Sequence, residues 1–196
     1  MLFHISEEAA ISRFDPRPSE YSTVPVVWAI DDDRLRNYLV PRECPRVTYD
    51  AGPNTTMADR ERFLGSTPAV VAIEDAWLER LRRARLFCYH FAADAFACLD
   101  ECAGYFVSQD PAIPIRIEVI DDPIAELERR NVELRVIPNL WPLRDAVIES
   151  SLRFSIIRMR NAQPRATADD DTPISAPRRA GEKNDRDRER GVERRV

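Results

Sequence analysis

The sequence predicts an α+β fold: a single domain with a mixed β-sheet and flanking helices, followed by a disordered tail. Short β-branched runs alternate with helical patterns along most of the 196 residues. Hydrophobic residues make up 44% of the chain, which is enough for one sizeable core. After residue 163 large apolar residues almost disappear, so that segment cannot bury enough surface to offset chain entropy. We therefore expect one domain over residues 1–163 and a disordered charged tail over residues 164–196.

Strands are expected where β-branched and aromatic residues cluster in short runs. These runs are MLFHI (1–5), VPVVWAI (24–30), AVVAIE (69–74), RLFCYHF (85–91), GYFVS (104–108), IRIEVI (115–120) and VELRVI (132–137). Helices are predicted over residues 31–39, 57–64, 75–84, 92–102, 122–130 and 142–160. Asp122 and Pro123 mark the clearest helix start, because aspartate suits the capping position and proline the first helical position, and Asn131 suits the end of that helix.

The charge of the chain is mildly acidic, with 29 lysines and arginines against 34 aspartates and glutamates. Nine bases and eight acids fall in the tail, which leaves 20 bases and 26 acids in the body, a net charge of −6. A body without a basic surface argues against generic nucleic-acid binding. No apolar run approaches the roughly 18 to 20 residues of a membrane span. The start of the chain turns acidic before the apolar region of a signal peptide could form, so we expect a cytoplasmic protein.

The cysteines of a cytoplasmic chain stay reduced, which makes a disulfide framework the less favoured interpretation. Cys88 and His90 share one strand face, and Cys98 and Cys102 would share one face of the following helix. These four residues could ligate zinc, but their spacing departs from the paired C-x2–4-C pattern of zinc sites. We favour buried, hydrophobe-like cysteines and predict no metal.

Nucleophilic catalysis has little support from spacing. The chain lacks a G-x-S-x-G elbow and a glycine-rich phosphate loop, and His4 and His90 are its two histidines. His4 shares a strand face with Leu2, and from the residues alone a histidine bonded to a backbone carbonyl is the favoured interpretation. The acids at 31–33 open a helix, where capping is their expected role. Arg158 and Arg160 could each grip a carboxylate or a phosphate, although pairing with the acids of the body is favoured.

Three segments, MLFHISE, VVWAIDDDRLRNYLVPRECPRVTYDAGP and SLRFSIIRMRNAQP, together resemble an uncharacterised bacterial family of domains of unknown function. The resemblance covers nearly all of residues 1–164. It implies a single domain that ends near Gln163, and it implies no particular activity.

A second resemblance is to the ADP-ribosyltransferase fold, including its RNA 2′-phosphotransferase relatives. His4 in LFHIS is similar to the first-strand histidine that binds the ribose of NAD in those proteins. The segment VVWAIDDDRLRNYL resembles the strand and helix that follow, and it offers Trp28 or Tyr38 as the aromatic residue that stacks on nicotinamide. The resemblance thus implies NAD or a related nucleotide as the ligand. It makes His4 and Tyr105 the candidate catalytic residues, and His4, Trp28, Tyr38 and Arg158 the candidate cofactor-binding residues.

The sequence departs from this family at the late glutamate that many members use. Gly104 and Tyr105 stand where the acid is expected, Glu101 comes three residues early, and Glu118 lies inside the next predicted strand. The phosphotransferase relatives use histidine and arginines instead, for which the candidates are Arg13, Arg46 and Arg158. The competing hypothesis is a non-catalytic binding or regulatory module that recognises a protein partner through its acidic body and arginine-rich end.

Overall fold

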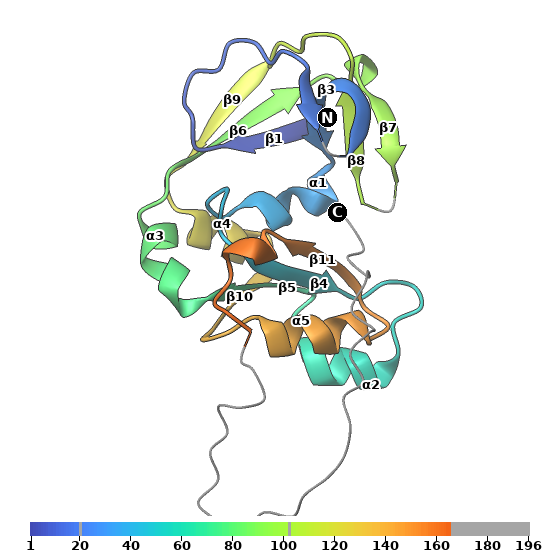
Figure 1. Cartoon of the computed structure of the whole chain (residues 1–196), viewed down its shortest axis with the longest axis vertical. Coiled ribbons are helices and arrows are strands. Elements are labelled where there is room, and N and C mark those ends of the chain that lie inside the picture. Colours follow the sequence, from blue (N-terminus) through green and yellow to red (C-terminus); the bar gives the residue numbers. More distant parts are fainter. Residues whose placement is uncertain (20, 102, 166–196) are drawn as a thin grey trace, which may run out of the picture.

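The computed structural model describes residues 1–19, 21–101 and 103–165, and it contains two β-sheets stacked one above the other (Figure 1). The larger sheet has the strand order β7-β8-β3-β1-β6-β9, and β2 pairs with β3 as well. Its strands are β1 (Leu2–Ser6), β2 (Arg17–Ser19), β3 (Ser22–Ile30), β6 (Leu86–Phe91), β7 (Ala97–Asp100), β8 (Tyr105–Ser108) and β9 (Arg116–Ile120). The smaller sheet has the order β10-β5-β4-β11. Its strands are β4 (Arg46–Asp50), β5 (Ala69–Glu74), β10 (Val132–Ile137) and β11 (Arg153–Ile157).

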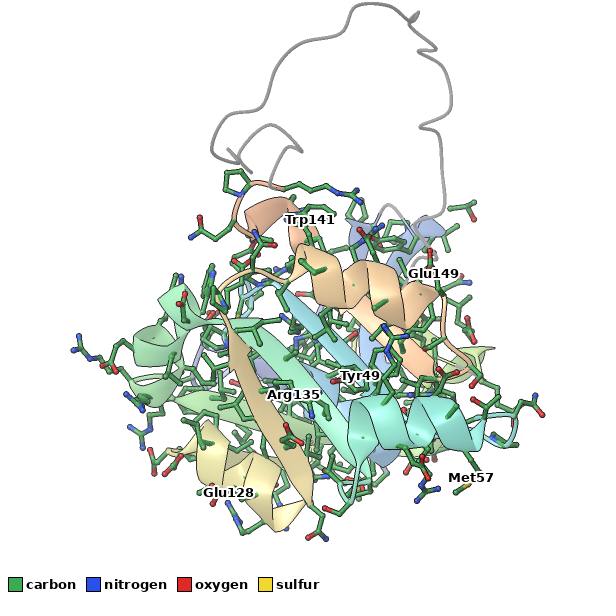
Figure 2. The ribbon with its side chains drawn as sticks, turned by 90° about the horizontal axis from the view of Figure 1, so that it is seen from below. Tyr49, Met57, Glu128, Arg135, Trp141 and Glu149 are labelled. Atoms are coloured by element: carbon green, nitrogen blue, oxygen red, sulfur yellow. The ribbon has the colours of Figure 1, made fainter. Side chains whose placement is uncertain are left out.

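Short helices connect the strands. They are α1 (Asp32–Leu35), η1 (Arg36–Tyr38), α2 (Met57–Asp59), η2 (Arg60–Leu64), η3 (Asp75–Trp77), α3 (Leu78–Arg82), η4 (Ala93–Ala95), α4 (Pro123–Arg129), α5 (Trp141–Ile148) and η5 (Met159–Asn161). Helix α1, continued by η1, lies between the sheets, while α2 and α5 cover the outer face of the smaller sheet (Figures 1 and 2). In the described part of the chain, no helix has the length and apolar character needed to cross a membrane.

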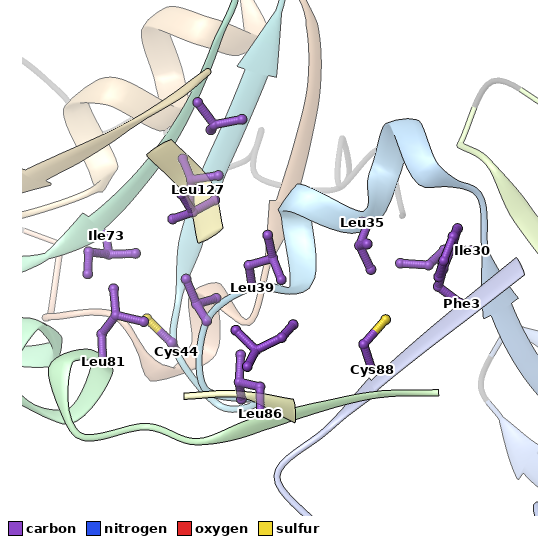
Figure 3. Close-up of a cluster of buried hydrophobic side chains, with 14 of the residues drawn as sticks. Phe3, Ile30, Leu35, Leu39, Cys44, Ile73, Leu81, Leu86, Cys88 and Leu127 are labelled. Atoms are coloured by element: carbon purple, nitrogen blue, oxygen red, sulfur yellow. The ribbon is translucent and has the colours of Figure 1, made fainter. Parts of the chain in front are cut away.

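The main apolar core fills the space between the sheets (Figure 3). Phe3 and Ile30 reach it from the larger sheet, Ile73 from the smaller sheet and Leu39 from the segment after η1. Two further clusters cover the outer faces. One packs α5 and η2 against β4 and β5, and the other lies on the larger sheet around Leu2 and the aromatic residues of β6. Both sheets are therefore apolar on both faces for much of their area.

The predicted fold class is confirmed, with a mixed arrangement of strands in an α+β domain. Each of the predicted strand runs contains a strand, and β5 and β10 coincide with their predicted limits. The helix predicted over 122–130 forms α4, because Asp122 Oδ1 accepts hydrogen bonds from the backbone N–H groups of Ile124 and Ala125. Asn131 follows with a φ of 56°, in the left-handed conformation that ends helices.

The long helix predicted over 142–160 is wrong, because α5 ends at Ile148 and β11 follows it. The Ser150 hydroxyl donates to the carbonyl of Val147 at 2.7 Å, which satisfies one of the last helix carbonyls. The residues after it alternate between the two faces of a strand that pairs antiparallel with β4. Pairing with β4, a strand that the sequence did not predict, outweighs the helical pattern.

The helix predicted over 92–102 is also wrong, since only the short turn η4 and the strand β7 form there. All four residues of β7 are exposed, so packing of their side chains does not hold this segment in a helix against the domain. Backbone pairing with β8 orders it instead. Cys98 consequently lies on a strand rather than on a helix.

The end of the described chain is fixed by the buried carboxylate of Glu74, which is 1% exposed. Glu74 accepts a hydrogen bond from the backbone N–H of Gln163. Arg165 then pairs with Asp145 of α5. The first residues of the predicted tail thus contact the domain, and residues 166–196, for which a disordered tail is predicted, lie outside the described residues.

Truncation of the core between the sheets should destabilise the protein strongly. Leu39 is fully buried, so Leu39→Ala should lower the free energy of unfolding by about 2–5 kcal/mol. The variant loses the hydrophobic transfer free energy of the removed atoms, and it also leaves a cavity in the core. Leu99→Ala is the control, because Leu99 is 49% exposed on β7. Urea unfolding of both variants checks this, and an equal effect of the two would contradict the assignment of the core.

Candidate functional site

The side chain of His4 is half-buried on the outer face of the larger sheet. Its neighbours Phe3 and Ile5 point into the core between the sheets, whereas its own ring packs edge-on against Phe14, with 4.9 Å between centroids. His4 Nδ1 lies 3.0 Å from the backbone carbonyl oxygen of Trp28. Since a carbonyl can only accept, Nδ1 carries the proton and donates it. This is the backbone-bonded histidine that the residues alone favoured.

Three aromatic side chains meet on the inner side of the same sheet. Trp28 alternates with Val27 and Ala29, which pack on the outer face, so the indole points inward. It contacts the ring of Tyr105 edge-on, with 5.6 Å between centroids. The hydroxyls of Tyr105 and Tyr38 are 2.9 Å apart and share a hydrogen bond. The sheet therefore separates the imidazole of His4 from the predicted stacking residues.

Two arginines extend this group toward the smaller sheet. The guanidinium of Arg46, on β4, lies 5.5 Å from the centre of the Tyr38 ring. Arg158 follows directly after β11, and its positive charge lowers the pKa of both Tyr38 and Arg46. We call Trp28, Tyr38, Tyr105, Arg46 and Arg158 the aromatic–arginine cluster.

Arg46 is the least usual member of this cluster, because its side chain is buried and only 2% exposed. Its guanidinium donates to the backbone carbonyls of Asn37 at 2.7 Å and Cys44 at 2.8 Å, and more weakly to that of Arg42. Within the described residues it forms no ion pair with a carboxylate. By contrast, Arg158 is 29% exposed and lies 3.5 Å from Glu43.

Burial sets the ionisation of the cluster. It raises the pKa of Tyr38, although Tyr105, Arg46 and Arg158 oppose this. It also raises the pKa of Tyr105, and the neighbouring Tyr38 adds to that rise. Both phenols therefore stay protonated at neutral pH. Burial lowers the pKa of His4 against the effect of the Trp28 carbonyl, so the imidazole is neutral. Burial lowers the pKa of Arg46 as well.

A second polar group lies further along β4, and the sequence analysis missed it. The carboxylate of Asp50 is buried and pairs with Arg36 at 2.9 Å, with Arg34 at 3.6 Å and with Arg153. Arg36 Nε and Asn37 Oδ1 are buried without a hydrogen-bond partner among the described residues. The sequence signal for this group is RVTYD (46–50), in which polar and apolar residues alternate. Because side chains of a strand alternate between its faces, this pattern places Arg46 and Asp50 on the same side of β4, the side that faces η1.

Several predicted residues lie apart from the cluster. Arg13 pairs with Asp15 on the surface. Glu101 is exposed in the turn before β8, and Glu118 pairs with Arg116 on β9, at the far edge of the larger sheet. Two shallow surface hollows, one around Arg80 and Arg83 and one around Arg144 and Asp145, include none of the candidate residues.

The zinc alternative fails on geometry for the described ligands. Cys88 and Cys98 lie on β6 and β7, which are separated in the sheet by β8, β3 and β1. Cys98 pairs with Phe106, whose side chain packs on the outer face, whereas Cys88 packs in the core between the sheets, so the two thiols point to opposite faces of the larger sheet. His90 faces Glu118 instead, at 3.3 Å. No group of three potential ligands that could hold a metal occurs in the described ranges, and Cys102 lies outside them.

This arrangement is suited to binding an anion beside an aromatic surface. Guanidinium groups bind phosphates and carboxylates through paired hydrogen bonds, and the protonated tyrosine hydroxyls can donate to the same groups. Trp28, Tyr38 and Tyr105 are half-buried, so part of each side chain is accessible to solvent. Among the described residues, Glu43 contacts this cluster, at 3.5 Å from Arg158, whereas Arg46 pairs with no carboxylate.

Comparison with protein-family models matches residues 3–162 to a family of unknown function, DUF6886. The chain belongs to this family. The match confirms the resemblance to a family of domains of unknown function, and the family's description assigns no activity. No curated protein and no solved structure matches the chain. The resemblance to ADP-ribosyltransferases therefore stays a prediction for this member of the DUF6886 family.

The lowered pKa of His4 predicts acid sensitivity. Its ordinary pKa is 6.5, and the lower value in the folded state means that the unfolded chain binds a proton more readily. The contribution of neutral His4 to the free energy of unfolding is therefore fully present above pH 6.5, and it is lost as the pH falls below that value. His4→Asn keeps an N–H donor for the Trp28 carbonyl but does not titrate. Urea unfolding on both sides of the ordinary pKa should show a smaller acid loss in the variant than in the wild type, and equal losses would contradict the assignment.

Proposed function

We propose that this domain binds NAD or a related nucleotide at the aromatic–arginine cluster. The observation that carries the proposal is Arg46, which is 2% exposed and has no carboxylate partner among the described residues. Burying a charge without a counter-charge costs several kcal/mol, a cost that proteins usually offset with an ion pair. A phosphate placed against Arg46 would supply the missing negative charge.

The neighbours of Arg46 support a phosphate in particular. Arg158 adds a second guanidinium, and Tyr38 and Tyr105 add two hydroxyls, which are hydrogen-bonded to each other. Two cations with flanking donors suit the several oxygens of a phosphate or pyrophosphate better than they suit a single carboxylate. The pair of Arg158 with Glu43 is long, at 3.5 Å, so the Arg158 side chain is not strongly committed to it.

The aromatic members of the cluster support a ligand that carries a ring. Trp28 and Tyr105 form an edge-on pair at the border between the sheets, and Tyr38 joins it through its hydroxyl. Aromatic side chains offer large apolar contacts to flat rings such as nicotinamide or adenine. Phosphate donors next to aromatic rings are the combination that a nucleotide requires, and this agrees with the resemblance of the sequence to ADP-ribosyltransferases.

The residues fit binding better than they fit glutamate-dependent transfer. Bound NAD would supply a nicotinamide–ribose bond for cleavage. The two nearby glutamates in the sequence, Glu101 and Glu118, lie in an exposed turn and on the distant β9. His4, which would hold the ribose by resemblance, has its Nδ1 on the Trp28 carbonyl and its ring on the outer face. We therefore derive no catalytic step for this chain.

A non-catalytic binding or regulatory module is the second candidate function. The observation that favours it is the position of His4, which is bonded to backbone and separated by the sheet from Tyr105. Such a module could still bind a nucleotide as its signal. Incubation of the purified protein with NAD distinguishes a catalytic domain from a non-catalytic module. Nicotinamide released faster with the protein than without it would require catalysis.

Binding should depend on Arg158 and not on the neighbouring Arg160. Both arginines lie 3.5 Å from Glu43, and the charge of Arg158 lowers the pKa of Tyr38 and of Arg46. A hydrogen bond to a charged group contributes about 1.5–3 kcal/mol, so Arg158→Gln should weaken the binding of ADP-ribose by about tenfold or more. Arg160→Gln should leave it nearly unchanged. Isothermal titration calorimetry measures both dissociation constants.

Separate titrations identify the part of the ligand that is recognised. ADP-ribose and NAD test the whole nucleotide, and nicotinamide alone tests the aromatic part. If the wild type bound neither NAD nor ADP-ribose at millimolar concentration, the proposal would be wrong. Equal losses in Arg158→Gln and Arg160→Gln would place the binding site elsewhere.

A further inference from the structure

Strand β9 is an unprotected edge of the larger sheet. It pairs with β6 on one side, and within the described residues no strand pairs with its other side. Its first four residues, Arg116 to Val119, are all exposed. Natural sheets usually shield such edges, because their unpaired N–H and C=O groups can bind another strand.

The side chains on one face of this edge are apolar. Ile115, Ile117 and Val119 alternate along the chain, so they share the outer face of the sheet. They are 61%, 42% and 43% exposed, and Ile113, just before them, is 69% exposed. Exposed apolar residues gathered along one edge indicate a contact surface more strongly than the same residues scattered over the protein.

The opposite face of β9 carries one charge of each sign. Arg116 and Glu118 share that face and pair with each other within the strand. Charges normally protect an edge, because two like strands then repel each other. Here the order of the charges has the opposite effect, since an antiparallel copy centred on Ile117 places each Arg116 beside a Glu118 of the other chain.

The same register matches the apolar face. Ile115 of one copy lies opposite Val119 of the other, and the two Ile117 side chains meet at the centre. Directly opposed residues in an antiparallel pair point to the same face, so these six side chains would form one continuous apolar stripe. Such a contact uses the same surface on both chains, which is the commonest symmetry of homodimers.

We propose that β9 pairs with β9 of a second copy of this chain, antiparallel and about a twofold axis through Ile117. The two larger sheets then join into one continuous sheet across the dimer. The opposite edge, β7, lacks this complementarity, because its single charged residue is Asp100 and a register shift interrupts its ladder after Cys98. The dimer does not depend on the proposed nucleotide site, which lies on the other side of β1 and β6.

The oligomeric state of the full chain tests this proposal. Sedimentation velocity should give a species of twice the chain mass of 22.6 kDa, populated increasingly at higher concentration. Ile117→Lys places two like charges against each other at the axis, which should weaken the dimer by about tenfold or more. Leu99→Lys on β7 is the matched control and should leave the dimer intact. Circular dichroism confirms that both variants are folded, as their exposure leads us to expect.

A charge exchange tests the register. Glu118→Arg sets an arginine opposite Arg116 of the second copy and should weaken the dimer, while the double variant Arg116→Glu with Glu118→Arg restores opposite charges and should restore it. A monomeric wild type at the highest soluble concentration would overturn the proposal. A dimer that survives Ile117→Lys unchanged would also overturn it.

Ile117→Cys provides a direct probe of the axis. In a background with Cys98→Ser and Cys102→Ser, mild oxidation should link two chains covalently through the introduced thiols, because opposed positions of antiparallel strands come within disulfide distance. The matched variant Ile113→Cys, away from the axis, should link far less. Equal linking at both positions would contradict a twofold axis at Ile117.

Discussion

The polar side of β4 is the constraint on which the region between the sheets depends. All five residues of this strand are buried, although its inner face carries Arg46 and Asp50. Buried polar groups must be hydrogen-bonded or paired, and the segment that provides the partners is α1–η1. Arg46 donates to the carbonyl of Asn37, and Asp50 pairs with Arg36. These contacts fix η1 against the smaller sheet and hold Tyr38 against Tyr105 of the larger one.

The elements predicted well from sequence are those whose own residues determine them. Helix α4 has its capping aspartate and first-turn proline, and β5 is a continuous apolar run. The elements that were missed depend on distant partners. Strand β4 carries a charge at each end, and the partners of these charges lie in α1, η1, β11 and the segment just before β4. The residues of β11 have a helical pattern, and they form a strand because β4 lies beside them. Likewise, the sequence supplied the members of the candidate site but could not show that the larger sheet separates His4 from Trp28 and Tyr105.

The two faces of the larger sheet thus suit different roles. The inner face, with Trp28 and Tyr105, borders the arginines of the smaller sheet and is the face on which we propose the nucleotide site. The outer face holds His4 among aromatic residues, where a neutral imidazole bonded to backbone serves the packing of the sheet. A resemblance based on the first strand alone would assign His4 to the site, but the alternation of side chains decides which face each residue reaches.

The position of β11 beside β4 also governs how the protein can fold. Asp50 and Arg153 are neighbours in the sheet but lie 103 residues apart in the chain. The smaller sheet cannot be completed during synthesis until nearly the whole domain has left the ribosome. Until then Asp50 lacks one of its guanidinium partners and β4 has an open edge. Long-range pairing of this kind slows folding, because a large loop must close before the contacts form. We therefore expect the domain to be completed slowly and late, when β11 pairs with the open edge of β4.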